Sequence, residues 1–475
     1  MKILYVTSEA TPFIKSGGLA DVAGSLPQGI KKEGHDIRVV LPLYSDIDEE
    51  YKKGLKKATS FNIELGWRSQ YVGVMEKKHN GIHYYFIDNE YYFKRDGLYG
   101  YFDDGERFIF FSKAVAMMIK YLKFKAEIVH ANDWHTGLVP LYIEDFAKGD
   151  RLYEKIKTVF TIHNLRYQGI FDYKILSQIG GLSEDYFNED GLKYYEAVNL
   201  MKAGIVYSDR LTTVSQTYAE EIKTEFFGEN LDGIIRKHDY KLSGIVNGID
   251  YDVYNPEKDK KIEKNYNFKT IKDKKENKRA LQKLYGLKKK DVPLLGMVTR
   301  LVDMKGLDLL SHIMEELMQE DLQLVVLGTG DWKYEEMLDY FQSKYPDKIA
   351  SRLYFSEEES HKIYAGADIF LMPSMIEPCG ISQLIAMRYG TIPVVRKTGG
   401  LKDTVIPYNK YDGSGTGFSF LNFNAHEFLF TIKDAAKLYE DKDKWETLIK
   451  QAMDRKNDWE TSSKEYIQLY QGLQT

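Results

Sequence analysis

Several features that would indicate whole classes of protein are missing from this chain of 475 residues. Its one cysteine, Cys379, cannot form an internal disulfide, which favours a reducing cytosol. No stretch approaches the ~20 apolar residues of a membrane span, and the opening MKILYVTSEATPF indicates a strand rather than a signal peptide. The net charge of −5 argues against nucleic acid, which would favour a basic face.

These absences predict a cytoplasmic protein without a membrane or nucleic-acid partner. In a eukaryote the equivalent compartment would be a plastid-like stroma, although the chain shows no transit peptide.

The length is too great for one core, so two or three domains are expected. Apolar runs of strand length occur at 3–6, 37–41, 127–131, 158–162, 210–214, 242–246, 293–298, 322–328, 352–355, 368–373 and 391–395. Such continuous runs are typical of strands buried on both faces of a parallel sheet. After the first run, Leu19, Val22, Ala23, Leu26 and Ile30 share one helical face, which completes a strand–turn–helix unit.

A lysine-rich tract interrupts this pattern between Pro256 and Val292. Acidic residues are interleaved with the lysines, so the tract is predicted to be a solvated linker and short helix at the front of a second domain. The chain thus reads as two α/β halves that join near residue 245. In open α/β sheets, ligands bind at the carboxyl ends of the strands.

The pattern K-[ST]-G-G-L-x-D occurs twice, beginning at Lys15 and at Lys397. Gly17 and Gly18 would let backbone N–H groups approach a ligand, and the helix that follows offers its positive end to an anion. An ordinary tight turn before a helix would use the same glycines. The pattern is not G-x-G-x-x-G, so the fingerprint of a dinucleotide site is missing.

The second half of the chain has charged residues at positions where a ligand would bind. Arg300 and Lys305 follow the run at 293–298, and two cations at a strand exit suit a diphosphate. A pair of surface salt bridges is the plainer alternative. Downstream, Glu377 lies in a turn before Gly380 and Ser382. A carboxylate there can face the neutral, polar part of a ligand while the amide groups of the helix hold the ligand's phosphate.

With these residues in place, the sequence resembles the bacterial-type glycogen and starch synthases, which are retaining glucosyltransferases of the GT-B fold. The resemblance covers almost the whole chain, through KSGGLADVAGSLP (15–27), HANDWHTGLVP (130–140), VFTIHNLRYQGIF (159–171), GIVNGIDYDVYNP (244–256), TRLVDMKGLDLL (299–310), PSMIEPCGISQ (373–383) and KTGGLKDTV (397–405). The EPCG and KxGGL blocks are specific within the wider fold.

The departures from the family pattern are small. Ser16 replaces the usual threonine and keeps the hydroxyl, while Met375 and Ile376 replace the more usual Arg-Phe and alter the local charge. The E-x7-E pattern of many related transferases is not completed, since Ile385 occupies its second position. This favours the glycogen synthase branch.

The resemblance implies two Rossmann-like, doubly wound domains facing across a cleft. The expected boundaries are 1–244 for the acceptor-side domain, 245–456 for the nucleotide-sugar domain and 457–475 for a helix that returns to the first domain. The implied reaction is retaining transfer of glucose from ADP-glucose to the non-reducing end of an α-1,4-glucan, such as glycogen or a maltooligosaccharide. It forms a new α-1,4 link and releases ADP.

By the same resemblance, the catalytic residues are Glu377, His163, Arg300, Lys305 and Asp133. The ADP-glucose site is expected to comprise Lys15, Gly17, Gly18, Asp21, Asn247, Arg300, Lys305, Tyr354, Glu377, Gly380, Ile381 and Ser382. The family's proposed route is front-face displacement, in which the departing phosphate takes the acceptor's proton. Glu377 would then bind sugar hydroxyls, and His163 would act mainly through its backbone carbonyl.

Charge stabilisation by Arg300 and Lys305 would replace a metal, so no cofactor is expected. D-x-D strings occur at 46–48, 250–252 and 441–443, but such matches arise by chance among 71 acidic residues, and none adjoins the cation pair. His130, His135 and His163 lack the usual zinc spacings, which favours structural or substrate-facing roles. Cys379 is predicted to be a small residue packed behind Glu377 rather than a nucleophile.

Three alternatives remain at this point. A glucan synthase that uses UDP-glucose, or a related retaining GT-B glycosyltransferase, would fit most of the same residues. A nicotinamide or flavin oxidoreductase would need the missing glycine fingerprint. A non-catalytic glucan-binding protein would have lost the charged set that is present here. The donor base, acceptor length, effectors and oligomeric state are left open.

Overall fold

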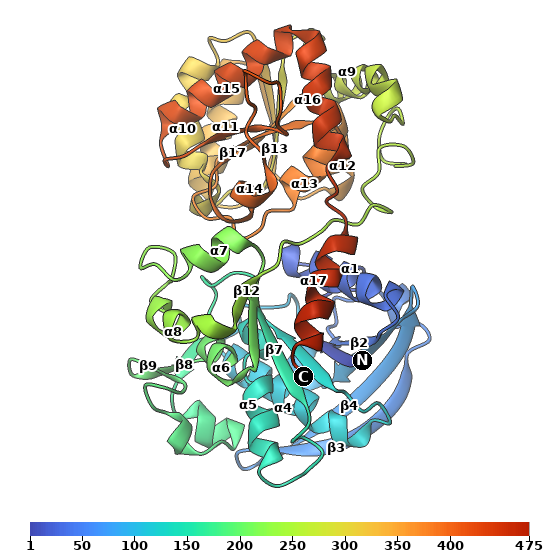
Figure 1. The fold of residues 1–475 in the computed structure, drawn as a ribbon, viewed down its shortest axis with the longest axis vertical. Helices are drawn as coiled ribbons and strands as arrows, with labels where there is room; N and C mark the ends of the chain where they lie inside the picture. Colours follow the sequence, from blue (N-terminus) through green and yellow to red (C-terminus); the bar gives the residue numbers. More distant parts are fainter. Residues whose placement is uncertain (475) are drawn as a thin grey trace. The chain divides into compact units, whose positions relative to one another are not determined.

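The computed structural model describes residues 1–474 and divides the chain into two compact units (Figure 1). Unit 1 comprises Met1–Asn247 together with the carboxy-terminal stretch that begins at Trp459, and unit 2 comprises Gly248–Asp458. The boundaries expected from the sequence, 244/245 and 456/457, lie a few residues before these divisions. Both units are Rossmann-like α/β domains, which confirms the predicted fold class.

Unit 1 is built on a nine-stranded sheet. In spatial order its strands are β12 (Leu242–Gly244), β11 (Arg210–Thr213), β7 (Lys157–Ile162), β6 (Ile128–Asn132), β1 (Lys2–Val6), β2 (Asp36–Pro42), β5 (Ile82–Asp88), β4 (Arg68–His79) and β3 (Lys56–Leu65). The strands from β12 to β5 run parallel, with Ile3 opposite Ile37 on one side and Ile128 on the other. All six runs predicted in this half contain a strand.

The strands at the β3 edge were not predicted from the apolar runs. β4 pairs antiparallel with both β3 and β5, so a hairpin extends the parallel sheet. β3 and β4 are only partly buried, so their sequences lack the continuous apolar run used as the signal. A second, three-stranded sheet comprises β8 (Ile170–Asp172), β10 (Ala197–Asn199) and β9 (Lys193–Tyr194).

The helices of unit 1 are α1 (Gly18–Lys32), α2 (Glu49–Lys52), α3 (Glu90–Phe93), α4 (Asp104–Tyr121), α5 (Val139–Ala147), α6 (Leu200–Tyr207), α7 (Gln216–Glu221), α8 (Asp232–Lys237) and α17 (Trp459–Gln471). The predicted apolar face of α1 is buried throughout. α17 packs beside α1 so closely that a Cβ on Gly29 would lie 2.0 Å from Ser463 Oγ (Figure 1). The carboxy-terminal helix is therefore part of unit 1.

Shorter helical turns of unit 1 lie at Trp134–Thr136, Leu176–Gly180, Glu184–Tyr186 and Asp239–Lys241. In unit 2 the equivalent turns lie at Phe268–Asp273 and Asp303–Lys305.

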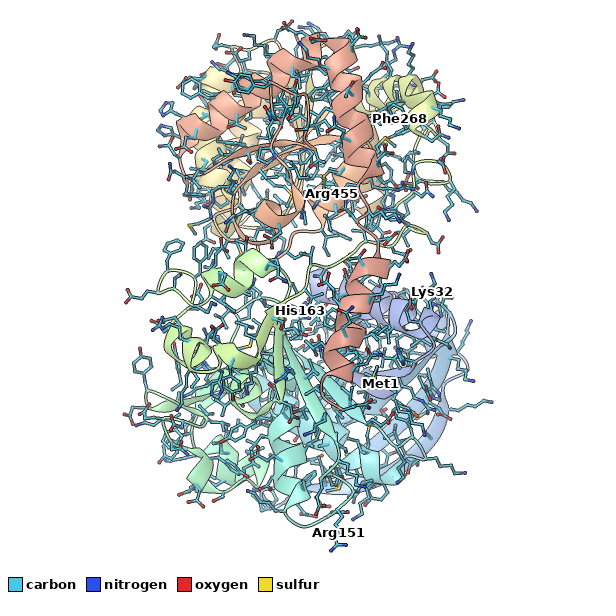
Figure 2. All side chains as sticks on the ribbon, viewed as in Figure 1. Met1, Lys32, Arg151, His163, Phe268 and Arg455 are labelled. Carbon is cyan, nitrogen blue, oxygen red and sulfur yellow. The ribbon has the colours of Figure 1, made fainter. Side chains whose placement is uncertain are left out.

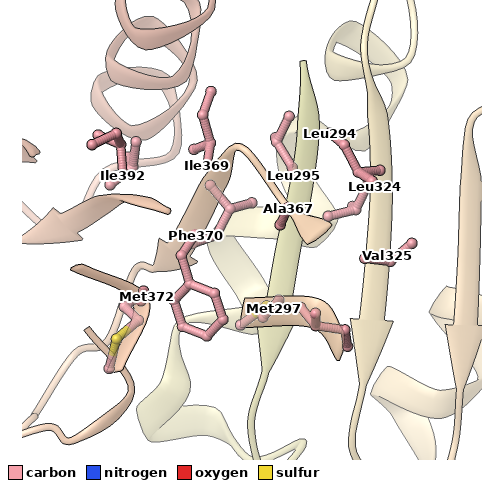
Figure 3. Packing of buried hydrophobic residues seen from close by; sticks show 14 of the residues in the cluster. Leu294, Leu295, Met297, Leu324, Val325, Ala367, Ile369, Phe370, Met372 and Ile392 are labelled. Carbon is pink, nitrogen blue, oxygen red and sulfur yellow. The ribbon is translucent and has the colours of Figure 1, made fainter. Parts of the chain in front are cut away.

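Unit 2 contains a six-stranded parallel sheet, in the order β15 (Ile349–Arg352), β14 (Gln323–Leu327), β13 (Leu294–Val298), β16 (Ile369–Met372), β17 (Ile392–Arg396) and β18 (Phe418–Phe420). Its helices are α9 (Lys274–Leu284), α10 (Leu307–Leu317), α11 (Trp332–Lys344), α12 (Glu357–Gly366), α13 (Ser382–Arg388), α14 (Gly399–Thr404), α15 (Ala425–Glu440) and α16 (Lys442–Asp454). Figure 3 shows core side chains gathered around β13, β14, β16 and β17. Burial of these strands on both faces explains their continuous apolar sequences.

Two sequence-based expectations about unit 2 are wrong in detail. The strand expected at 352–355 lies at Ile349–Arg352, so Tyr354 and Phe355 follow the strand and are exposed. The lysine-rich tract is not wholly solvated, because Lys274 and Lys278 of α9 are buried. Lys274 Nζ donates to the carbonyl of Ala365 and to Thr391 Oγ1, both at 2.7 Å, and Lys278 Nζ pairs with Asp368 at 2.6 Å. These acceptors satisfy the donors of the two buried side chains, although burial lowers the pKa of Lys274 to about 7.

Among residues 1–474, no helix has both the length and the apolar character needed to cross a membrane.

Candidate active site

The predicted site residues of unit 1 follow the carboxyl ends of its parallel strands. Asp133 follows β6 and His163 follows β7. Figure 2 shows His163 at the end of the unit 1 strands opposite to Arg151. Asn247 comes shortly after β12, and its buried side-chain oxygen has no hydrogen-bond partner within residues 1–474.

The first glycine turn leads directly into α1. Gly17 is the residue before the helix and has an extended backbone with φ −160°, while Gly18 is the first helical residue. A Cβ placed on Gly17 would meet nothing within 4 Å, so the turn borders open space. Lys15 Nζ lies 2.7 Å from Asp21 Oδ1, and both side chains are partly exposed. Lys15 and Asp21 are thus brought together as an ion pair.

Glu9 is a residue beside this turn that sequence reasoning missed. Its carboxylate accepts a hydrogen bond from the backbone N–H of Ser16, and its side chain is buried. Burial raises the pKa of Glu9 to about 7, although hydrogen bonds from Ser16 and Gly17 oppose the shift. Its position three residues after β1, at the carboxyl edge of the sheet, was the signal that could have identified it.

Asp133 and His163 are linked through the backbone. The N–H of Asp133 donates to the carbonyl of Thr161 at 3.0 Å, and Asp133 Oδ1 accepts from the N–H of His163 at 2.8 Å. Burial of the carboxyl group raises the pKa of Asp133 to about 7, and the N–H groups of His163 and Asn164 partly oppose this. The positive φ of Asp133, 56°, turns its side chain toward the next strand exit.

The His163 ring is fixed by Asn132, which sequence reasoning also missed. Asn132 Nδ2 donates to the carbonyl of Val6 at 2.9 Å, so Oδ1 must be the atom that lies 2.9 Å from His163 Nε2. Because an amide oxygen only accepts, the imidazole carries its proton on Nε2. Burial lowers the pKa of His163 to about 3, so the ring is neutral at physiological pH.

His130 and His135, the other two histidines considered as metal ligands, contact side chains of the protein core. His130 Nδ1 lies 2.7 Å from the hydroxyl of Tyr470 on α17, and its Nε2 lies 2.6 Å from Thr161 Oγ1. The His135 ring stacks on Trp134 and lies tilted against Tyr99, with ring centroids 4.4 Å apart. Across residues 1–474, no group of three or more His, Cys, Asp or Glu side chains is arranged to hold a metal ion.

In unit 2, Lys305 and Glu377 form the centre of the predicted donor site. Lys305 Nζ donates to Glu377 Oε2 at 2.6 Å, and Ser374 Oγ donates to the same oxygen at 2.9 Å. Glu377 is 7% exposed, so the ion pair is largely removed from water. Arg300 is exposed, and its guanidinium makes no hydrogen bond or ion pair within the described chain. One cation is therefore held against the carboxylate and the other is available to a ligand.

The second glycine turn packs against the segment that carries Glu377. Gly399 has φ +43°, and a Cβ there would lie 2.0 Å from the carbonyl oxygen of Glu377. A Cβ on Gly400 would lie 2.1 Å from the carbonyl oxygen of Cys379. Cys379 itself is buried next to this contact, as expected for a packing residue. These glycines are needed for close packing rather than for open space.

The remaining predicted donor residues lie around this segment. Gly380 has φ +74°, Ile381 precedes α13, and Ser382 opens that helix and accepts a hydrogen bond from Tyr364 at 3.0 Å. Tyr354 is 43% exposed after β15, with its hydroxyl 2.6 Å from Glu359 Oε1. Its accessible ring could stack on a planar ligand. Roles for these residues stay predictions.

In each of the D-x-D strings, the first carboxylate accepts a hydrogen bond from a backbone N–H group. Asp46 accepts from the N–H of Gly97 at 2.6 Å, and Asp441 caps α16 through the N–H of Lys444. Asp250 accepts from the N–H of Asp252 at 2.7 Å. Such carboxylates occupy turns and caps.

Comparison with known proteins assigns both units to glycosyltransferase families. Residues 2–237 match the family described as "Starch synthase catalytic domain", and residues 279–454 match "Glycosyl transferases group 1". The chain is 59% identical over 474 residues to a glycogen synthase of Finegoldia magna and 52% identical to one of Bacillus cereus, with all of each chain covered. The catalytic domain of starch synthase IV from Arabidopsis thaliana, solved with ADP and acarbose, superposes with a TM-score of 0.93 at 32% identity and 99% coverage of both chains.

Proposed function

This chain belongs to the glycogen and starch synthase family of glycosyltransferases, and on that premise we propose that it extends α-1,4-glucans with glucose from ADP-glucose. The product would be a glucan longer by one α-1,4-linked glucose, and ADP would be released. The observation that carries the proposal is that Arg300 and Lys305 both follow β13 and that Lys305 pairs with the Glu377 carboxylate. The ADP in the starch synthase IV structure supports an adenine nucleotide as the donor.

We assign the diphosphate to the two cations. Arg300 supplies a planar fork that suits phosphate oxygens, and Lys305 supplies a point charge. A hydrogen bond to a charged group contributes roughly 1.5–3 kcal/mol in net terms. Together they neutralise the charge that develops on the departing ADP, so the reaction is proposed to need no metal ion.

The chemical step is proposed to retain configuration at the anomeric carbon. The bond from C1 of glucose to the β-phosphate oxygen breaks, and its electron pair leaves with ADP. The O4 hydroxyl at the end of the glucan forms a bond to C1 on the same face, and its proton passes to the departing phosphate. Glu377 binds sugar hydroxyls in this scheme and does not attack C1.

On unit 1, Asp133 and the backbone carbonyl of His163 are assigned to the reacting sugar or the acceptor. The neutral His163 ring adds no positive charge beside the oxocarbenium-like C1. A carbonyl oxygen facing that centre would stabilise its developing positive charge. Lys15, Asp21 and the glycine turn are assigned to substrate contact at the amino end of α1.

The test of donor choice is glucose incorporation into a glycogen primer with ADP-glucose and with UDP-glucose. A clear preference for ADP-glucose is expected, and a preference for UDP-glucose would favour the alternative donor. Repeating the assay in EDTA tests the metal proposal. Activity abolished by EDTA and restored by magnesium or manganese would overturn it.

We also infer a cytoplasmic site of action without nucleic-acid or membrane partners. The single Cys379 and the similarity to bacterial glycogen synthases support this location. Fractionation of cells that express the chain would test it, with the activity expected in the cytosolic fraction.

A further inference from the structure

The Glu377 carboxylate, carried by the segment from Pro373 to Cys379, is held by one oxygen. Oε2 accepts hydrogen bonds from both Lys305 Nζ and Ser374 Oγ. No hydrogen bond to Oε1 occurs within residues 1–474. Because two donors on one oxygen fix the rotation of the carboxylate, the second oxygen keeps a defined direction and a free pair of acceptor sites.

Ser374 can orient Glu377 only if its own backbone is fixed, and Arg396 provides this. Arg396 is the last residue of β17, the neighbour of β16 in the sheet, and its side chain is 8% exposed. Its Nε donates to the carbonyl of Ser374 at 2.8 Å, and its Nη2 donates to the carbonyl of Met375. A rigid planar fork that bonds two successive carbonyls sets the orientation of both peptide groups, which a lysine cannot do.

The same segment is tied to the turn that carries Lys305. The N–H of Met375 donates to the carbonyl of Met304 at 2.8 Å, and a Cβ on Gly306 would lie 2.0 Å from the carbonyl oxygen of Pro373. The two residues that pair with each other are thus carried by two segments in direct backbone contact. Arg396 therefore orients the segment that carries Ser374 and Glu377, and that segment lies against the turn of Lys305.

We propose that Ser374 and Arg396 are positioning residues that aim Oε1 of Glu377 at a hydroxyl group of the donor sugar. The inference rests on the proposed function, since it assumes that Glu377 binds the sugar. Neither residue touches substrate in this scheme. Their loss lets the carboxylate rotate about its side-chain bonds while Arg300 and Lys305 still hold the diphosphate.

The kinetic test separates sugar positioning from nucleotide binding. Ser374→Ala is expected to lower kcat about tenfold, the size of one charge-assisted hydrogen bond. Arg396→Lys and Arg396→Ala are expected to lower it further, to about 100-fold for the alanine variant. Inhibition by ADP should change less than about twofold in all three. Ser351→Ala and Arg455→Lys are matched controls, because each alters a partly buried side chain of unit 2 that hydrogen-bonds elsewhere.

Three further readouts exclude a merely structural role. Methylguanidinium at millimolar concentration should restore part of the activity of Arg396→Ala, since it can refill the site of the lost guanidinium. In a Glu377→Gln background, Ser374→Ala should lower kcat little further, because the effects of residues that act as a unit are not additive. Thermal unfolding of Arg396→Lys is expected to stay within a few degrees of the unsubstituted protein.

The outcomes distinguish this inference from the proposed function. A fully active Glu377→Ala would overturn the role of Glu377 and the positioning role with it, whereas an unsubstituted protein that incorporates no glucose from ADP-glucose would overturn the proposed function. An inactive Glu377→Ala together with fully active Ser374→Ala and Arg396→Lys would overturn the positioning role alone. Additive losses in the double variant, or a loss of ADP inhibition as large as the loss of kcat, would also overturn it.

Discussion

The two copies of the K-[ST]-G-G-L turn occupy contrasting surroundings. At the first, Gly17 has an extended backbone and borders open space, and Lys15 pairs with Asp21. At the second, Gly399 has φ +43°, and its backbone presses against the carbonyl of Glu377. The same residues therefore border open space in unit 1, where a ligand could bind, and allow close packing of another backbone segment in unit 2. A short motif specifies a backbone shape, and the neighbours decide its use.

The largest effect is expected at the second turn. Gly399→Ala would place a Cβ against the backbone of Glu377 at a positive φ, so the unfolding free energy should fall by about 4 kcal/mol and activity should be lost. Gly413→Ala is the control, since Gly413 also has a positive φ, +74°, but no atom within 4 Å of its Cβ position. Denaturant unfolding should show a loss of only about 1 kcal/mol there. Equal losses would mean that the packing contact is unimportant.

Arg300→Ala should come next, because it removes the free cation of the donor site. We expect kcat/KM to fall about 100-fold or more, from the loss of charge-assisted hydrogen bonds to the diphosphate. Stability should be unchanged, since no protein partner is lost. Arg151→Ala, at the opposite end of the unit 1 strands from His163, is the control (Figure 2). A nearly fully active Arg300→Ala would contradict the diphosphate assignment.

Glu9 gives the first turn a pH dependence of stability. The pKa of Glu9 is raised from 4.5 to about 7 in the folded protein, so between these values the folded state holds a proton that the unfolded chain has released. Stability attributable to Glu9 is therefore present below pH 4.5 and is lost as the pH rises toward 7. Glu9→Gln should remove this loss, about 3 kcal/mol at most, and flatten the profile. Denaturant unfolding at several pH values, with exposed Glu50→Gln as the control, measures it, and an unchanged profile would contradict the raised pKa.

The smallest effect is expected at Gly17. Its φ of −160° is open to any residue and its Cβ position is free, so Gly17→Ala should change the unfolding free energy by no more than about 0.5 kcal/mol. Activity should still fall, by about tenfold, if the methyl group occupies space that the substrate needs. Initial rates at varied ADP-glucose and glycogen would locate the loss. A destabilisation like that of Gly399→Ala would remove the contrast between the turns.

Much of the fold could be predicted because buried parallel strands leave a plain pattern. The runs at 3–6 and 293–298 correspond to β1 and β13, and the face of α1 that begins at Leu19 is buried as its spacing predicts. The hairpin of β3 and β4 escaped, since its half-exposed strands have no continuous apolar run. Lys274 was assigned to solvent because its acceptors, the Ala365 carbonyl and Thr391, lie far along the chain.

In the candidate site, too, some residues could be predicted from the sequence and others could not. Arg300, Lys305 and Glu377 could be selected because cations and a carboxylate at strand exits suit a nucleotide-sugar. Glu9 and Arg396 could not, because their importance depends on what they touch. The Ser16 N–H that Glu9 accepts and the Ser374 carbonyl that Arg396 binds are backbone groups, whose positions no residue pattern records.

By itself, the sequence determined the fold class and the family, and it predicted the segments of the candidate site. These depend on residue type and local spacing, which periodic burial and short turns impose directly on the chain. Only the tertiary structure decided which glycine turn is open, which lysines are buried, and which oxygen of Glu377 is held. Each of these depends on contacts between segments distant in sequence, where a few tenths of an ångström separate a hydrogen bond from a clash.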